Sequence, residues 1–395
     1  MRTLFPYITK PIIILSVVSL FTDMASEMLY PVMPVFLTSI GFSVVLIGVL
    51  EGFAEMIAGL SKGYFGQLSD IRQKRLPFVQ LGYLFSALSK PMLAMFATPV
   101  WIFFSRTVDR FGKGLRTAPR DAMLSAETTS GNKGKVFGFH RSLDTFGAVL
   151  GPLSALIFLA AYPGNFRTLF LIAFIPGIIA VVLTFLLKEK KVAPRPQKIH
   201  FFSFLKYLRT SPLQYRKLLW GLLIFAVVNS TDVLLLLKMH DAGVDDKTII
   251  TIYIFYNLVY AIFSFPAGII ADKFGIKNTF IFGLVLFAMV YLGFALINDI
   301  RIYWILFFIY GMYAACTEGI AKAWITNVVP GKETGTAIGA YTSIGSVAAF
   351  IASAMAGTLW ALFSPTVAFG FTALVVIGVI VYMVTVPYKL GEDSA

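Results

Sequence analysis

Two carboxylates in the first long apolar stretch of the chain lie where an ionised group is costly. Asp23 and Glu27 are four positions apart, which places both on one face of a helix, one turn from each other. An ionisable group in the middle of a bilayer costs at least about 2.5–3.5 kcal/mol, so such groups persist when they pair, face water or work. Two such carboxylates repel each other, which favours a proton on one of them. The pair predicts a proton-coupling site; the alternative is that each acid pairs with a base and holds helices together.

The fourth apolar stretch carries a charged stripe. Steps of three and four place its members on one helical face: Arg106, Asp109, Lys113, Arg116 and Arg120. Arg106, Arg110 and Lys113 are candidates for lining a substrate cavity, and the mostly positive stripe favours an anionic or carboxylate-bearing cargo. The alternative is a charge ladder neutralised by acids of neighbouring stretches. Arg116 lies near the end of its stretch and is a candidate for gating.

Further charges lie in the third and fifth stretches. Lys90 is deep in its stretch and is expected to pair with an acid of the second stretch, such as Glu55. Arg141 and Asp144 are close enough along a helix to pair with each other, which predicts a structural role. Arg141 is also a candidate for the cavity and Asp144 for proton coupling.

The second half of the chain is poorer in charge. Its candidates for the substrate cavity are Asn229, Asp232, Tyr256, Glu318 and Lys322. Glu318 and Lys322 are spaced to neutralise each other within one helix. Tyr256 belongs to a row of tyrosines at helical spacing, which predicts contact with an amphipathic substrate or, alternatively, aromatic packing.

The elements that carry these residues are long apolar stretches. Of the 395 residues, 58% are hydrophobic and 13% charged, with a mean hydropathy of +0.81, more apolar surface than a soluble fold of this length can bury. Stretches of about 20 apolar residues suit a bilayer's hydrocarbon core. Twelve are expected, at 11–37, 44–68, 77–97, 100–118, 136–161, 166–187, 216–238, 248–271, 279–298, 302–325, 334–362 and 366–386. The sequence therefore predicts an all-α integral membrane protein.

The distribution of Lys and Arg predicts orientation. They cluster in alternate loops, for example Arg72, Lys74 and Arg75, which accounts for the formal net charge of +13 and places both termini in the cytoplasm. We expect a multi-pass protein of the cell inner membrane with the lipid bilayer as a partner. The sequence does not predict a basic groove with interleaved aromatic residues, so it does not indicate nucleic-acid binding.

The chain is expected to divide into two six-helix bundles, residues 1–187 and 216–395. Between them, residues 188–215 form a basic, proline-containing cytoplasmic linker. The segment "FFSFLKYL" within it predicts a short helix along the membrane surface.

The halves repeat each other. Asp23 in "FTD" corresponds to Asp232 in "STD", and the Asp109–Lys113 spacing of four recurs in the second half. Several such landmarks recur in the same order at a similar offset, which indicates internal duplication.

At the loop after the second stretch of each half, the chain resembles the major facilitator superfamily. The family pattern G-x-L-a-D-[RK]-x-G-[RK]-[RK] is matched in the second half by Gly268, Asp272, Lys273, Gly275 and Lys277. In the first half, Gly66 and Asp70 match, but Gln73 replaces the second glycine, which predicts a differently shaped turn. "GAVLGP" at Gly147–Pro152 is similar to a motif common among proton-coupled antiporters, or simply permits close helix packing.

The resemblance implies twelve helices in two pseudo-symmetric bundles that rock about a central site. It gives the loop-motif residues Gly66, Asp70, Gly268, Asp272, Lys273 and Gly275 the role of a cytoplasmic gate, which Arg116 is a candidate to share. We expect a monomeric secondary active transporter of a small molecule that is driven by proton coupling, with no cofactor and no metal. The alternatives are a drug/proton antiporter working in efflux and a transport-dead membrane receptor. No catalytic motif or ATP-binding loop indicates an enzyme.

Overall fold

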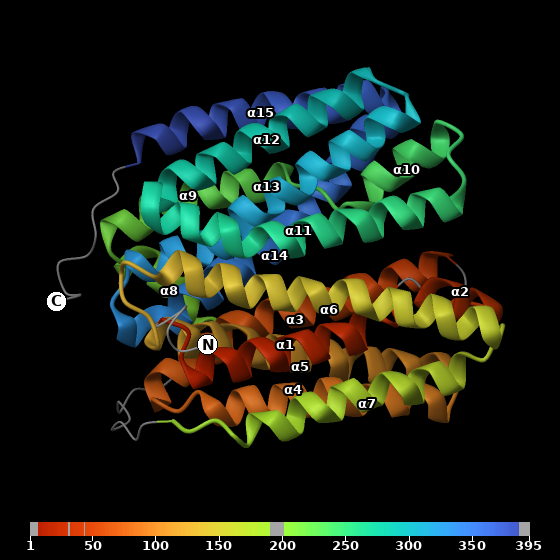
Figure 1. Cartoon of the computed structure of the whole chain (residues 1–395), viewed down its shortest axis with the longest axis horizontal. Helices are drawn as coiled ribbons and strands as arrows, with labels where there is room; N and C mark the ends of the chain where they lie inside the picture. The colour runs from red at the N-terminus through yellow and green to blue at the C-terminus, as the bar shows by residue number, and fades with distance from the viewer. Residues whose placement is uncertain (1–6, 31, 43, 190–200, 387–395) are drawn as a thin grey trace. The chain divides into compact units, whose positions relative to one another are not determined.

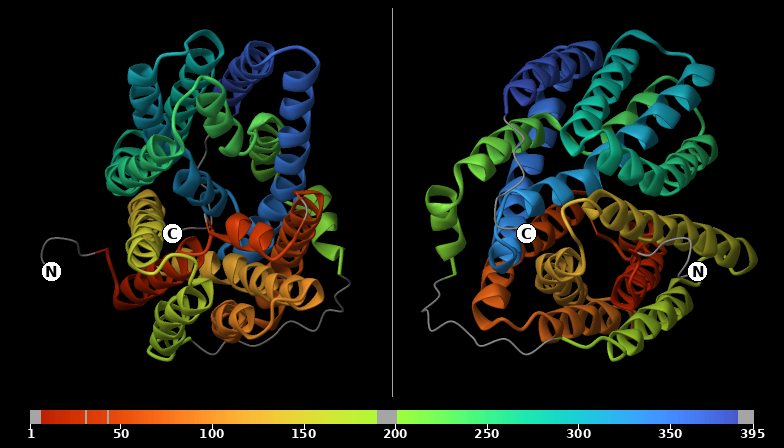
Figure 2. Two further views of the ribbon diagram at one scale, coloured as in Figure 1. Left: turned by 90° about the vertical axis from the view of Figure 1, so that its right-hand side faces the viewer. Right: turned by 60° about the vertical axis from the view of Figure 1, so that its left-hand side comes forward.

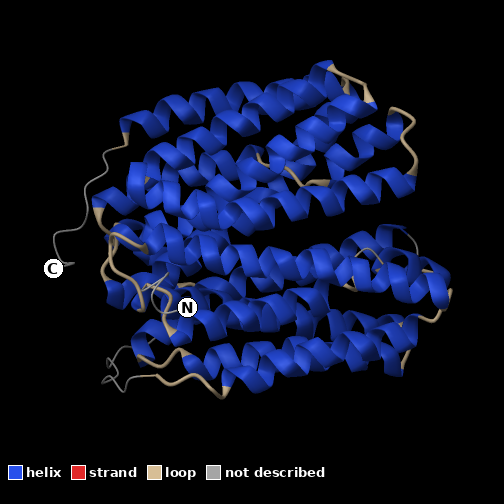
Figure 3. Cartoon of the chain, viewed as in Figure 1, coloured by secondary structure: helices blue, strands red, loops and turns tan. Residues whose placement is uncertain are grey.

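The computed structural model describes residues 7–30, 32–42, 44–189 and 201–386. Every regular element in these ranges is a helix (Figure 3). Eight of the described helical segments are long and apolar enough to cross a membrane by length and composition. The protein is an all-α integral membrane protein.

Figure 1 traces the helices in chain order. The first seven are α1 (Lys10–Glu27), α2 (Met33–Ser39), α3 (Val44–Arg72), α4 (Leu76–Met95), α5 (Pro99–Ala126), α6 (Lys133–Ala161) and α7 (Phe166–Thr184). The remainder are α8 (Ser203–Thr210), α9 (Leu213–Val228), α10 (Val233–Asp241), α11 (Asp246–Phe274), α12 (Ile276–Leu296), α13 (Ile300–Asn327), the short 3₁₀ helix η1 (Gly331–Glu333), α14 (Thr334–Leu362) and α15 (Pro365–Thr385). With α8 set apart, and with α1–α2 and α9–α10 each counted as one segment, these described helices correspond to the twelve expected stretches.

Two of the twelve stretches are interrupted, which the sequence analysis did not predict. The stretch 11–37 is split between α1 and α2, and 216–238 is split between α9 and α10. Proline at position 31 of the sequence disfavours helical backbone at the residue before it. The second interruption falls at Asn229–Asp232, whose short polar side chains compete for backbone hydrogen bonds.

Two backbone amides at the second interruption donate hydrogen bonds to side-chain hydroxyl groups of unit 2. The amide of Thr231 donates to Ser353 Oγ at 3.1 Å, and the amide of Val233 donates to Thr231 Oγ1 at 3.4 Å. Such bonds are required because lipid offers no partner to an open backbone group.

The chain forms two compact units that exchange segments. Unit 1 comprises residues 1–128, 143–208 and 331–343. Unit 2 comprises residues 129–142, 209–330 and 344–395. The N-terminal part of α6 therefore belongs to unit 2 and that of α14 to unit 1, although each helix lies in the opposite half of the sequence.

Within unit 1, α4 packs against α5 and α7, α3 against α5, and α1 against α7 (Figure 2). Glycine permits the α4–α5 contact, since a Cβ added at Gly82 would lie 2.6 Å from Arg116 Cβ and 2.7 Å from Gly112 O. Within unit 2, α13 packs against α11 and α12, and α12 packs against α15. These contacts hold α5 and α13, which carry the candidates Arg106, Arg110, Lys113, Arg116, Glu318 and Lys322.

The short helix expected in the linker is confirmed as α8, and its aromatic side chains pack into unit 1. Phe204 is only 1% exposed and fills the space left by Gly63, where an added Cβ would lie 2.6 Å from the ring. Phe201 stacks on Tyr64 with ring centroids 5.3 Å apart. Tyr207 OH donates to Glu333 Oε2 at 3.1 Å, so α8 contacts both α3 and the segment that precedes α14.

We predict that Phe204→Ala releases α8. The lost burial and the remaining cavity cost about 3–5 kcal/mol, the usual range for a buried phenylalanine. Limited proteolysis of the purified protein is expected to cut residues 201–212 faster in this variant than in the wild type. Phe202→Ala is the matched control because Phe202 is 57% exposed; equal cleavage of both variants would contradict the docking of α8.

Candidate functional site

Most of the charged stripe on α5 is neutralised inside unit 1. Lys90 Nζ on α4 lies 2.7 Å from Asp109 Oδ1, and Arg106 Nη1 lies 3.7 Å from Asp109 Oδ2. All three side chains are buried. The expected pairing of Lys90 with an acid of the second stretch is wrong, because α4 packs against α5 and brings Asp109 closer. Glu55 on α3 instead lies 3.6 Å from Arg110 Nε.

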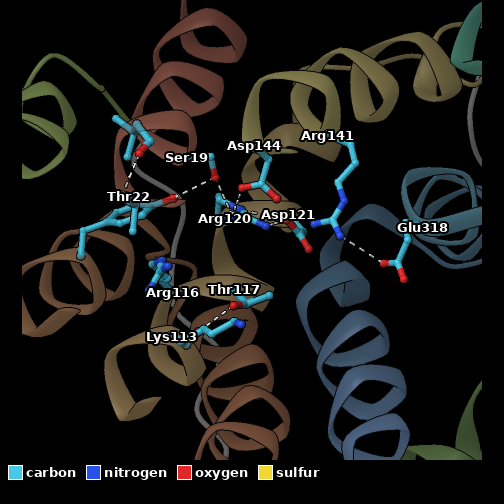
Figure 4. A network of polar contacts seen from close by, with 12 residues as sticks. Ser19, Thr22, Lys113, Arg116, Thr117, Arg120, Asp121, Arg141, Asp144 and Glu318 are labelled. Carbon is cyan, nitrogen blue, oxygen red and sulfur yellow. Dashed lines mark hydrogen bonds and ion pairs between the residues drawn. The ribbon is translucent and has the colours of Figure 1, made fainter. Parts of the chain in front are cut away.

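Arg120 joins three helices of unit 1. Its Nη2 lies 2.9 Å from Asp121 Oδ1, and its Nη1 lies 3.9 Å from Asp144 Oδ1 on α6. Nη1 also donates to Ser19 Oγ on α1 at 2.7 Å (Figure 4). Such pairing matters because the loss of one partner would leave an uncompensated buried charge. Asp144, a candidate for proton coupling, thus lies beside a fixed guanidinium.

Arg116 is held by neutral groups of α4. Its Nη1 donates to Ser86 Oγ at 2.8 Å, and its guanidinium carbon lies 4.7 Å from the centroid of the Tyr83 ring. Arg116 is buried, and these contacts fix it against α4. Its gating role stays a prediction.

Three of the charged candidates in unit 1 lie outside this network. Asp23 and Glu27 on α1 and Lys113 on α5 are each half-buried. Within the described part of the chain, the structure shows no hydrogen bond or ion pair for their charged groups. Lys113 exerts the strongest electrostatic attraction on both carboxylates. Their roles in proton coupling and in the substrate cavity stay predictions.

The glycines of "GAVLGP" bring α6 against α1 beside these residues. A Cβ at Gly147 would lie 2.2 Å from Leu20 O, and one at Gly151 would lie 2.7 Å from Met24 O. The structure therefore supports close helix packing, which was one of the two interpretations of this motif.

In unit 2, the interruption between α9 and α10 meets a tyrosine cluster. Tyr310 OH donates to Asp232 Oδ1 at 2.6 Å, and Asn229 Nδ2 donates to Tyr313 OH at 3.3 Å. Tyr256 stacks on Tyr310 with centroids 5.1 Å apart and is 7% exposed. Aromatic packing thus accounts for most of the Tyr256 surface, and Asp232 is anchored by a hydroxyl group.

Arg141 contributes to unit 2 from the N-terminal part of α6. Its Nη2 lies 3.5 Å from Glu318 Oε2, and its Nε donates to Tyr260 OH. The guanidinium also lies 5.2 Å from the centroid of the Tyr260 ring. The structure thus gives Glu318 a partner outside its own helix, while the pairings within helices, Glu318 with Lys322 and Arg141 with Asp144, stay predictions.

The first loop motif binds the N-terminus of α14 in unit 1. Asp70 Oδ2 accepts from Thr336 N at 2.7 Å and from Thr336 Oγ1 at 3.0 Å. Arg75 Nη2 lies 3.0 Å from Asp70 Oδ1. Gly66 permits the approach, since an added Cβ would lie 2.3 Å from Gly335 O.

The second loop motif binds the N-terminus of α6 in unit 2 in the same way. Asp272 accepts from Gly134 N and from Lys135 N, both at 2.8 Å. A Cβ at Gly268 would lie 2.2 Å from Gly134 O. Each motif aspartate therefore contacts the positive end of a helix, whereas gating stays a prediction.

The turn after each motif uses left-handed backbone. Gly275 has φ +103° and Gln73 has φ +51°, which is uncommon for a residue with a side chain. The Gln73 side chain donates to Asp70 O, a bond that a glycine cannot make. Both turns are left-handed, but they differ in shape, as the missing glycine predicted.

Three polar residues of the site escaped the sequence analysis: Ser19, Tyr83 and Ser86. They are buried and fix Arg116 and Arg120. Small hydroxyl residues in apolar stretches are frequent, so no sequence signal separates these from ordinary helix-packing residues. Among the described residues, no three His, Cys, Asp or Glu side chains converge on a metal site.

Solved structures of low sequence identity share this fold. The human organic anion transporter MFSD10 (TETRAN) aligns with a TM-score of 0.81 at 16% identity, over 94% of this chain and 98% of that one. The transporter FucP in its outward conformation aligns with a TM-score of 0.79 at 11% identity, over 97% of this chain and 100% of that one.

Sequence comparison identifies the family. An uncharacterized MFS-type transporter of Methanocaldococcus jannaschii is 33% identical over 368 residues, which is 92% of this chain and 91% of that protein. An uncharacterized protein of Mycobacterium tuberculosis is 26% identical over 185 residues, 47% of this chain and 44% of that protein. The sequence profile of the Major Facilitator Superfamily matches residues 15–239 and 233–394, and the chain belongs to this family of transporters.

Proposed function

We propose that this chain is a proton-coupled secondary active transporter that moves a small solute across the cell inner membrane by alternating access. The observation that carries the proposal is the group of Asp23, Glu27 and Lys113. These charges are half-buried in helices of a family transporter, yet they lie outside the ion pairs that Arg106, Asp109 and Arg120 of the stripe form. Charged groups at membrane depth mark proton and solute pathways.

The coupling follows from charge balance around Lys113. While Asp23 and Glu27 are ionised, they attract the Lys113 ammonium. A proton on either carboxyl weakens that attraction and leaves positive charge available to an anionic cargo. Because linkage is reciprocal, a bound anion then favours the protonated acid to the same extent. This scheme couples anion and proton movement in the same direction.

The ion pairs within the α5 stripe limit which residues can contact the cargo. Arg106 and Arg110 are engaged with Asp109 and Glu55, so Lys113 is the candidate that contacts an anionic group. The tyrosines around Tyr256 in unit 2 offer apolar surface with hydroxyl groups, which suits an amphipathic solute. Drug/proton antiport is a weaker alternative, since the "GAVLGP" motif that favours it has a packing role here.

The two motif aspartates are proposed to stabilise one conformational state of the transporter. Asp70 and Asp272 each bind the N-terminus of a helix at what we propose is the cytoplasmic side, where both termini would also lie. Contacts that form in one state and break in the other shift the balance between states. The proton gradient would drive the cycle with no cofactor, and we propose that the monomer works in the bilayer without nucleic acid.

We predict that Asp23→Asn and Glu27→Gln abolish gradient-driven accumulation of cargo, because an amide does not carry the proton. The cargo is first identified by a thermal-shift screen of the purified protein against metabolites, siderophores and drugs at two pH values. Accumulation and proton influx are then measured together in liposomes loaded with a pH-sensitive dye.

Glu127→Gln is the matched control for this experiment, since Glu127 is exposed in the same unit and bonds to Thr9. Its accumulation is expected to match the wild type. If both amide variants of α1 kept the wild-type pH dependence of transport, these carboxylates would have no part in coupling.

A second prediction concerns the motif aspartates. Asp70→Asn removes a charged cap from the N-terminus of α14, a change of about 0.5–2 kcal/mol. Amide hydrogen exchange at 334–340 is expected to become roughly 2–30-fold faster, while exchange at 133–138 changes little. Asp272→Asn should reverse this pattern.

Asp299→Asn is the control, because Asp299 caps α13 by accepting from Arg301 N and belongs to neither motif. It should leave both segments unchanged. Uniform acceleration over the whole protein in Asp70→Asn would show general destabilisation and would argue against a local cap.

A further inference from the structure

Unit 2 contains an apolar crevice that is lined by residues of α11, α12 and α13. These three helices are labelled in Figure 1. It has a volume of about 220 Å³, and its lining includes Phe263, Pro266, Ile270, Phe282, Met312 and Cys316. A dry apolar cavity of about 150 Å³ in a soluble protein already binds benzene. The crevice is therefore large enough for a segment of hydrocarbon chain.

The crevice opens on a surface that is apolar and exposed. Phe274 is 62% exposed, Phe282 50% and Ile270 48%. Such a continuous apolar flank belongs in contact with lipid in a membrane protein. Hydrocarbon from the bilayer therefore has direct access to the crevice.

Water is a poor occupant of this crevice. A buried water needs two to four polar partners. The two polar side chains of the α12 wall are already engaged, since Asn278 Nδ2 donates to Phe274 O at 3.0 Å and Thr279 Oγ1 donates to Gly275 O at 3.2 Å. An apolar occupant restores the dispersion contacts that an empty crevice lacks.

Positive charge lies at one end of the crevice. Lys273 is exposed, and its ammonium lies 5.2 Å from the centroid of the Phe274 ring, which itself lines the crevice. The described part of the chain shows no ion pair for Lys273. Lys277 donates to the carbonyl oxygens of Val384 and Val386, both at 2.7 Å. The Phe274 ring and the two carbonyl oxygens carry no formal negative charge that would balance these lysines. The neighbouring Asp272 accepts hydrogen bonds from two amides of α6.

From this geometry we propose that the crevice is a binding site for an anionic phospholipid. One acyl chain lies between α11 and α12 over Met312 and Cys316, and the phosphate lies at Lys273. The hydrocarbon crevice binds the chain, and the uncompensated ammonium selects an anionic headgroup. The crevice lining contains none of Asp23, Glu27 and Lys113. Lys273 also belongs to the second loop motif, but its proposed contact with the headgroup does not depend on proton coupling.

The test uses the full-length protein in lipid nanodiscs with phosphatidylglycerol that carries a diazirine in its acyl chain. After irradiation, peptide mass spectrometry is expected to locate cross-links at Phe282, Met312 or Cys316. Phosphatidylcholine with the same labelled chain should give about fivefold less cross-linking, the factor that corresponds to about 1 kcal/mol for one lysine at the membrane surface.

Two variants separate the headgroup from the chain. Lys273→Gln should remove the preference for phosphatidylglycerol, whereas Lys217→Gln should keep it, because Lys217 is an exposed lysine of α9 outside the crevice lining. Ala267→Leu fills the floor of the crevice and should lower cross-linking by both lipids. Retention of a monodisperse peak in size-exclusion chromatography shows that each variant is folded.

Three outcomes would overturn the proposal. Equal cross-linking by both lipids would exclude selection of an anionic headgroup. Cross-links spread evenly over other exposed apolar helices would show contact with bulk lipid only. Cross-links between two copies of the chain at Met312 or Cys316 would assign this face to self-association.

Discussion

Ionised side chains at membrane depth must be compensated, and α5 shows how this chain meets that constraint. Lys90 and Arg106 share the carboxylate of Asp109, and Arg120 draws Asp121, Asp144 and Ser19 around one guanidinium. These bonds tie α1, α4, α5 and α6 to one another in unit 1. Asp23, Glu27 and Lys113 lie outside these ion pairs, and the proposed function therefore depends on them.

Close backbone contact is the second requirement, and it follows from glycine. Gly66 and Gly268 let the end of α3 and the end of α11 touch the starts of α14 and α6, so that one aspartate at each place reaches backbone amides. The duplicated sequence thus produces a duplicated contact. A side chain at either glycine would separate the helices and leave the amides without their carboxylate partner.

Much of this arrangement was predictable from the sequence. Apolar length located the helices, and the family motif located Asp70 and Asp272 at the end of the second stretch in each half. Interruptions in two stretches were not predicted, because a hydropathy average over about 19 residues does not detect a short break flanked by apolar residues. Ion-pair partners were also partly wrong, as for Lys90, because periodicity shows which face a residue occupies but not which neighbouring helix faces it.

The exchange of residues 129–142 and 331–343 between the units bears on how the protein can be divided. If the chain were cut in the linker, each fragment would lack a segment that packs within its unit, because the other fragment encodes that segment. The first fragment would expose the glycine face of α3, and the second would expose that of α11. Reassembly from two co-produced pieces would therefore depend on mutual complementation, and neither piece is equivalent to one autonomous repeat.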